Sequence, residues 1–233
     1  MSRAYVDIKD VTLGIDIGST STRAYLRCPA TKEEWYVENP SDELIVTNGD
    51  FSSAGYPFRS KGPVYLGERA DPTSQAVSLK YAFYPLADAS DELLEQYHLV
   101  RSLMERKSDA KFLDRLRQGL EELLAVIKCS VDDICTRQRI KVTRIGLSIP
   151  SQWTLEFEDV YKNIVSSVFG HSQSSIFFHT ETEALAHYLL DEGLDYLLPD
   201  QHSEYRVFLF LDLGGHNMVS LLFPHVHLST SIL

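Results

Sequence analysis

The stretch Val11-Thr12-Leu13-Gly14-Ile15-Asp16-Ile17-Gly18 decides how this chain folds, because a second stretch, Val207-Phe208-Leu209-Phe210-Leu211-Asp212-Leu213-Gly214, ends in the same way. Each is apolar and rich in β-branched or aromatic residues, which predicts a buried strand that closes on an Asp-x-Gly turn. Glycine in such a turn lets backbone N–H groups approach phosphate oxygens, and the carboxylate before it can hold Mg²⁺ through its waters. Two such turns facing each other predict a clamp for one nucleoside triphosphate.

A single Asp-x-Gly turn is a weak signal, because ordinary hairpins use the same residues. The flanking residues make both turns more specific. The segment Gly14-Ile15-Asp16-Ile17-Gly18-Ser19-Thr20-Ser21-Thr22-Arg23 resembles the first phosphate motif of the actin, Hsp70 and sugar-kinase superfamily, and Leu211-Asp212-Leu213-Gly214-Gly215 resembles the second. This resemblance implies an α/β fold, namely an actin-like ATPase (ribonuclease H-like) lobe with a mixed sheet and flanking helices.

Composition is compatible with such a lobe. The chain has 233 residues, of which 44% are hydrophobic, so it can bury a core of one or two domains. The formal net charge of −11 argues against a general nucleic-acid binder, which needs a basic face. Three cysteines without zinc-site spacing indicate reduced thiols, and no apolar run is long enough to span a membrane, so we expect a cytoplasmic protein.

Hydrophobic periodicity predicts the order of the elements. We expect strands at 11–17, 22–27 and 34–38, followed by short strands and loops that include 51–58 and 64–67. Residues 88–134 follow a helical pattern, and 145–149 form a strand that Pro150 ends. A helix over 157–170 ends at Gly170, and a short strand at 176–178 precedes a helix over about 181–192.

The middle of the chain distinguishes between branches of the superfamily. Ser148-Ile149-Pro150-Ser151 and the helix after it are similar to the Hsp70 strand that ends in a Val-Pro-Ala turn. Thr180-Glu181-Thr182-Glu183-Ala184 resembles the Asn-Glu-Pro-Thr-Ala segment of Hsp70, and more closely its variant in divergent Hsp70-like proteins related to the twelve-A class. Val64-Tyr65-Leu66-Gly67-Glu68-Arg69-Ala70 resembles the Ile-Gly-Asp-x-Ala turn, and Lys80 stands where Hsp70 has its Ala-Lys.

Glycerol-type sugar kinases are the competing relatives, because their Gly-Thr-Thr-Ser-x-Arg opening is similar to Gly18-Ser19-Thr20-Ser21-Thr22-Arg23. Those enzymes need a carboxylate that deprotonates the substrate hydroxyl, and the chain has no clear counterpart. The Hsp70-like branch is therefore favoured over a sugar-kinase fragment. A non-catalytic scaffold that kept the lobe for interactions is a further alternative.

The resemblance implies a role for each site residue. Asp16 and Asp212 would hold the Mg²⁺ shell, and Lys80 and Glu181 are the catalytic candidates that position the attacking water and the γ-phosphate. Donors to the phosphates would be Gly18, Ser19, Thr20, Gly214 and Gly215. Lys80 lies among aromatic residues and has the alternative of stacking there, and Glu181 begins a helix in which Thr180 and Glu183 form a capping box. The ligands implied are ATP and Mg²⁺, with client proteins or co-chaperones as partners.

Two departures from the family limit the expected activity. After the glycine pair of the second phosphate motif, Hsp70 continues with Gly-Thr, whereas this chain has His216-Asn217. A β-carbon at residue 216 strains a turn that needs positive φ. The chain stops at Leu233, so we expect a first lobe over 1–203 and only the opening hairpin of a truncated second lobe over 204–233. We therefore expect weak Mg-nucleotide binding at most and no measurable hydrolysis.

Overall fold

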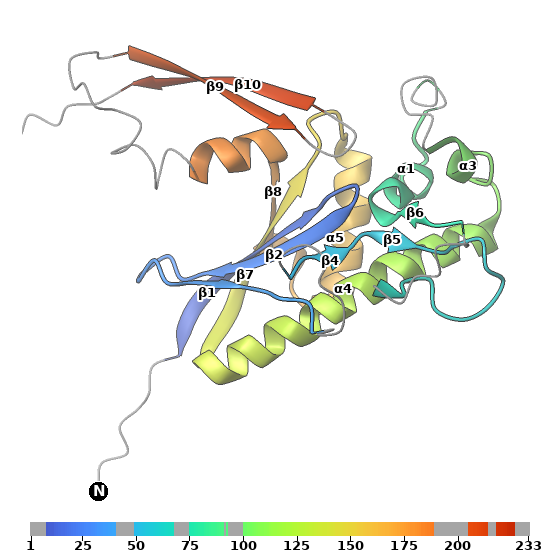
Figure 1. The fold of residues 1–233 in the computed structure, drawn as a ribbon, viewed down its shortest axis with the longest axis horizontal. Helices are drawn as coiled ribbons and strands as arrows, with labels where there is room; N and C mark the ends of the chain where they lie inside the picture. Colours follow the sequence, from blue (N-terminus) through green and yellow to red (C-terminus); the bar gives the residue numbers. More distant parts are fainter. Residues whose placement is uncertain are drawn as a thin grey trace, which may run out of the picture. The chain divides into compact units, whose positions relative to one another are not determined.

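The computed structural model describes residues 8–40, 49–67, 75–90, 92 and 100–188, together with the course of two strands at 205–213 and 218–226. The chain divides into two compact units, Met1–Phe178 and His179–Leu233, and each is described by itself. The first unit is a mixed α/β lobe in which helices pack on a mixed sheet (Figure 1). The α/β class expected from the sequence is therefore confirmed.

The main sheet is built around one central strand. Its order is β3-β2-β1-β7-β8, with β4 as a further partner of β2. β1 pairs antiparallel with β2 on one side and parallel with β7 on the other (Figure 1). The strands are β1 Lys9–Ile17, β2 Ser21–Arg27, β3 Glu34–Tyr36, β4 Phe51–Ser52, β7 Ile140–Ile149 and β8 Ile176–Thr180. A smaller sheet joins β5 Ala54–Gly55 to β6 Val77–Ser78.

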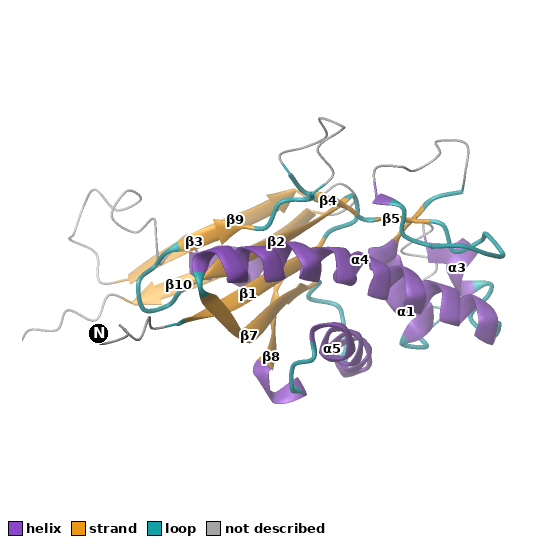
Figure 2. Ribbon diagram, turned by 90° about the horizontal axis from the view of Figure 1, so that it is seen from below, coloured by secondary structure: helices purple, strands orange, loops and turns teal. Residues whose placement is uncertain are grey.

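Two helices cover one face of the main sheet (Figure 2). Alternate residues of β1, among them Leu13 and Ile15, are buried on this face together with Ile145 and Leu147 of β7. The long helix α4, Ala110–Gln138, and the helix α5, Leu155–Phe169, pack against them and against each other. The remaining helical elements are η2 Leu79–Ala82, α1 Phe83–Leu86, α3 Arg101–Met104 and η4 Gln173–Ser175.

Local signals set the ends of the two long helices. The Asp109 side chain accepts a hydrogen bond from the Phe112 N–H at 3.2 Å and caps the start of α4. α4 ends where Arg139 adopts a left-handed conformation with φ 56°. α5 ends at Gly170, with φ 69°, as the sequence predicted.

The helical pattern predicted over 88–134 is wrong at its start. Asp88 has φ 49°, which is incompatible with a right-handed helix, and Asp109 interrupts the chain before α4 begins. The segment 64–67, expected among the short strands and loops, forms no regular strand, because Tyr65 makes only an isolated bridge to Gly55. These segments pack through side chains rather than through a regular ladder, which periodicity alone does not reveal.

The second unit contains the predicted hairpin. β9, Tyr205–Leu213, pairs antiparallel with β10, Met218–Val226, and Asp212 lies opposite Val219 in the register. Residues 181–188 are helical, and the remaining predicted helical residues, 189–192, lie outside the described part of the chain.

The three cysteines are free thiols in different environments. Cys28 is buried at the end of β2, Cys135 is half-buried on α4, and Cys129 is exposed on the same helix. From the sequence we expect Cys129 and Cys135 to pack in the fold, and this expectation is wrong for Cys129, which is exposed.

The packing of α4 generates the first prediction. Leu116 is completely buried in the hydrophobic core, so Leu116→Ala is expected to lower the free energy of unfolding by about 2–5 kcal/mol, through lost burial and the cavity left behind. Arg117→Ala changes an exposed neighbour on the same helix and is expected to stay within about 0.5 kcal/mol. Urea unfolding of both variants measures the difference, and equal effects would contradict the burial of this face.

Candidate functional site

The turn after β1 is tight and has open donors. The Gly18 N–H donates to the Ser21 carbonyl at 3.0 Å, and a β-carbon on Gly18 would lie 2.5 Å from that oxygen. The turn therefore requires glycine for its own closure. In the described part of the chain, nothing accepts a hydrogen bond from the N–H groups of Ser19 and Thr20, although the Thr20 carbonyl accepts from Ser53 at 3.0 Å. Two backbone donors are thus available to an anion at this turn.

Asp16 lies one pair before the turn, on the sheet face opposite the core. The register places Arg23 of β2 on one side of it and Ser148 of β7 on the other. The Ser148 hydroxyl donates to Asp16 Oδ1 at 2.5 Å. Two residues earlier on the same two strands, Gly14 is paired with Gly146. Neither residue has a side chain, so this face of the sheet is flat beside the Asp16 carboxylate. Asp16 is held in place by Ser148, while its second oxygen accepts no hydrogen bond from the described residues.

Arg23 is held by a buried carboxylate. Its Nε donates to Asp50 Oδ2 at 3.0 Å, and its side chain is 62% exposed whereas Asp50 is only 7% exposed. Ser21 and the Tyr36 hydroxyl also donate to Asp50. The hydrogen bond to Asp50 raises the pKa of Arg23, and the nearby charge of Asp16 adds to the effect. The guanidinium is therefore an oriented cation on the same face as Asp16.

Lys80 is buried, with 6% of its surface exposed, and lies in the 3-10 helix η2. This helix begins directly after Ser78, the last residue of β6, and leads into α1. Lys80 has an interaction partner in the structure. Asp16 and Lys80 belong to the same unit.

An aromatic cluster follows Lys80 and packs on α5. Phe83 lies 5.0 Å from Trp153 and 4.7 Å from Tyr161 between ring centroids, and Trp153 stacks on Phe157 at 5.0 Å. The Tyr161 hydroxyl and the Trp153 indole N–H are buried without a hydrogen-bond partner among the described residues. Burial raises the pKa of Tyr161 well above its ordinary value, and the charge of Asp16 contributes. The phenol therefore stays neutral and remains a buried hydrogen-bond donor.

Glu181 belongs to the second unit, at the start of the helix over 181–188. The predicted capping box is confirmed: the Thr180 N–H donates to Glu183 Oε2 at 3.1 Å, and the Glu183 N–H donates to Thr180 Oγ1 at 3.2 Å. These bonds to Thr180 lower the pKa of Glu183. Capping thus accounts for Glu183, while Glu181 is half-buried and has an interaction partner.

The second phosphate turn is only partly covered by the structure. Asp212 is the penultimate residue of β9, as the sequence predicted. Gly214 and Gly215 lie outside the described residues. Their role as phosphate donors stays a prediction.

Comparison with known proteins gives no family assignment: no family model and no curated protein matches this sequence. Among the described residues, no group of three or more His, Cys, Asp and Glu side chains is arranged to hold a metal ion. None of the described helices combines the length and the apolar character needed to cross a membrane.

Sequence reasoning missed four residues that shape the Asp16 region: Arg23, Asp50, Ser148 and Tyr161. One of them had a signal, because Gly146-Leu147-Ser148 repeats the spacing of Gly14-Ile15-Asp16 at the end of a second strand. Parallel strands with matching patterns place the two polar residues side by side. The contacts of Asp50 and Tyr161 are tertiary and had no such local signal.

The Asp50 cluster generates a pH prediction. Burial and the hydrogen bond to Asp50 raise the pKa of Tyr36 from 10.0 to about 12. A raised pKa in the folded state means that the stabilising contribution is complete below the unfolded value of 10.0 and is lost as the pH rises toward 12. We expect Tyr36→Phe to flatten the decline of unfolding free energy in this window.

The control is Tyr188→Phe, at a tyrosine that is 47% exposed. Denaturant unfolding at successive alkaline pH values should give the same decline for this variant as for the unaltered chain. A Tyr36→Phe variant with an unchanged decline would show that Tyr36 is not held by Asp50.

Proposed function

We propose that this chain binds ATP with Mg²⁺ as the first lobe of an Hsp70-like nucleotide-binding domain. The observation that carries the proposal is the turn after β1, where Asp16 precedes Gly18 and the N–H groups of Ser19 and Thr20 are open. Adjacent backbone donors that point to one place form an anion-binding site without any basic side chain. This fits a nucleotide binder with a formal net charge of −11.

The strand order supports the actin-like lobe. β2 and β3 continue the central strand β1 as a meander on one side, and β7 and β8, which are reached through α4 and α5, lie on the other side. This is a compact frame in which β1 ends beside its parallel neighbour β7. Ligand sites in α/β sheets gather at such carboxyl ends of neighbouring strands.

The donor set around Asp16 fits Mg²⁺. This ion keeps several waters and needs only one or two protein carboxylates when phosphates supply other oxygens. Asp16 has one oxygen fixed by Ser148 and the other available, so it can accept hydrogen bonds from the waters of a hydrated ion. When bound, Mg²⁺ would neutralise phosphate charge next to the donors of Ser19 and Thr20.

Chaperone-type turnover is the less supported part of the proposal. In Hsp70-like proteins the lysine and glutamate matching Lys80 and Glu181 position the attacking water, and Asp212 joins the metal shell. Lys80 is buried in the same unit as Asp16, which suits a positioned cation. With His216-Asn217 in the second turn, nucleotide binding coupled to partner control, with client proteins or co-chaperones as partners, is the activity that we propose.

A second candidate is a scaffold that binds no nucleotide. It is favoured by the contacts of Asp16, because Ser148 and the oriented Arg23 already give this carboxylate a structural role in the sheet. A carboxylate that joins β1 to β7 through Ser148 and lies near the charge of Arg23 needs no metal to explain it. Ligand-dependent stability separates the two candidates.

Thermal unfolding with and without Mg-ATP tests the proposal. At a free nucleotide concentration about ten times the dissociation constant, ligand binding adds about 1.4 kcal/mol to the folded state. For a chain of this size we expect the melting temperature to rise by about 4 °C. Asp16→Asn should abolish the rise, while its amide oxygen still accepts the Ser148 hydrogen bond and keeps the fold intact.

The matched control is Asp10→Asn, which removes an exposed carboxylate from the same strand. This variant should keep the rise in melting temperature. If the unaltered chain has the same melting temperature with and without Mg-ATP, the scaffold is favoured and the proposal of nucleotide binding is wrong.

Phosphate release measures turnover separately. We expect the chain to release no phosphate from ATP above background, because His216-Asn217 replaces donors aimed at the γ-phosphate. A rate that disappears in the Asp212→Asn variant would contradict the expectation of a hydrolytically inactive chain.

A further inference from the structure

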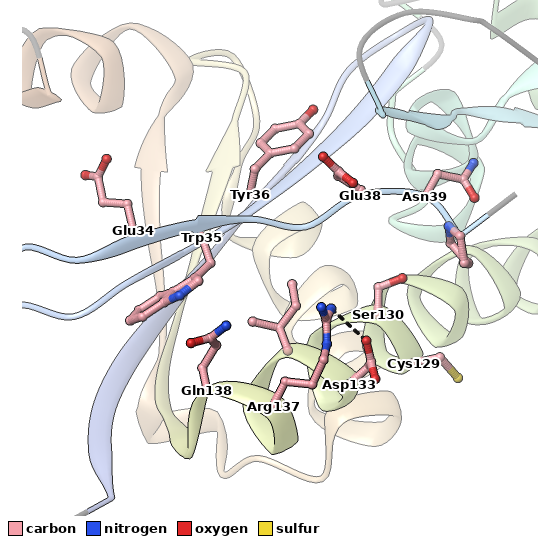
Figure 3. A pocket seen from close by; sticks show the side chains of 12 residues that line it. Glu34, Trp35, Tyr36, Glu38, Asn39, Cys129, Ser130, Asp133, Arg137 and Gln138 are labelled. Atoms are coloured by element: carbon pink, nitrogen blue, oxygen red, sulfur yellow. Dashed lines mark ion pairs between the residues drawn. The ribbon is translucent and has the colours of Figure 1, made fainter. Parts of the chain in front are cut away.

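A groove lies between β3, with the extended chain after it, and the C-terminal half of α4 (Figure 3). Its volume is about 720 Å³, within the range of sites that bind ligands. Residues 34–36 and 38–40 line one wall. The helix supplies Cys129, Ser130, Asp133, Ile134, Arg137 and Gln138.

The strand wall has an open backbone edge. The Val37 N–H donates to Ala24 at 3.0 Å, and the Glu33 carbonyl accepts from Cys28 at 2.9 Å, so these residues direct their backbone groups toward β2. Backbone groups alternate in direction along a strand, and those of Glu34 and Tyr36 therefore point outward. β3 is the last strand of the sheet order, and no strand in the described part of the chain pairs with this edge.

The two sides of the edge differ chemically. Figure 3 shows Trp35 on the side of α4, with Glu34 and Glu38 on the opposite side. On the helix side, Ile134 is an apolar floor, and Asp133 and Arg137 neutralise each other at 2.7 Å.

On the opposite side the charge is negative. Glu34 lies 3.5 Å from Arg27, and Glu38 is exposed without an ion pair among the described residues. A strand added here would meet an apolar surface on one face, and on the other face Glu38 as an acid without an ion pair among the described residues.

We propose that the β3 edge is a strand-addition site for an extended basic segment of a partner protein. The outward N–H and C=O groups of Glu34 and Tyr36 would pair with its backbone, which is how exposed sheet edges bind peptides. Alternate apolar side chains of the segment cover Trp35 and Ile134, and the intervening cations lie beside Glu34 and Glu38. The formal net charge of −11 draws a cationic partner to the chain. This site is independent of nucleotide binding.

Three synthetic peptides of equal length serve as probes. One alternates lysine with valine, one alternates glutamate with valine, and one alternates lysine with proline. The third keeps the charge of the first but cannot add a regular strand, because every second residue has its φ fixed near about −65° by the proline ring and lacks an N–H donor. Binding is measured by calorimetry, and amide hydrogen exchange reports which N–H groups become protected.

We expect the lysine–valine peptide alone to bind, and to slow exchange at the Glu34 and Tyr36 amides, whereas Val37 is already bonded to Ala24. Glu38→Lys should weaken binding about fivefold to tenfold by reversing one charge contact. Asp159→Lys makes the same charge change at an exposed position of α5 outside the groove and should leave the affinity unchanged.

Four results would overturn the proposal. The lysine–proline peptide could bind as well as the lysine–valine peptide, which would show that charge alone accounts for the binding. Protection could fall elsewhere than at Glu34 and Tyr36, or no peptide could bind. Concentration-dependent dimers that protect the same amides without peptide would assign the edge to a second copy of the chain.

Discussion

The two-sided pairing of β1 is the constraint on which the rest of this structure depends. Because side chains alternate along a strand, burial of Leu13 and Ile15 against α4 and α5 places Asp16 on the opposite face. A slip of one residue in the register would put the carboxylate into the apolar core and the leucine into the polar face. Core packing therefore positions the candidate site as strictly as any contact within the site.

Short-range signals were the part of the fold that could be predicted. The ends of β7 at Ile149 and of α5 at Gly170 follow from proline and glycine chemistry, and the capping box at Thr180 and Glu183 follows from spacing alone. Breaks inside a periodic pattern could not be placed in this way. The break at Asp88 depends on a left-handed backbone, which nothing in the neighbouring residues demanded.

The site residues likewise divide into those with a local signal in the sequence and those without one. Asp16 and Gly18 were found because strand and turn are local, and Ser148 could have been found from the matching Gly-x-Ser spacing. The bond between Asp50 and Tyr36 joins positions 14 residues apart through side chains that no pattern relates. The unsatisfied Tyr161 hydroxyl likewise depends on how α5 is set against the sheet.

The unequal burial of the three thiols makes one of them a selective target for thiol-reactive probes. A thiolate is the reactive form of cysteine, and burial together with the charge of Asp132 raises the pKa of Cys135, while Cys28 is shielded from solvent. Cys129 is the exposed thiol and lines the groove beside β3. A maleimide dye added briefly to the unaltered chain would therefore attach there first and report on that edge without any engineered residue.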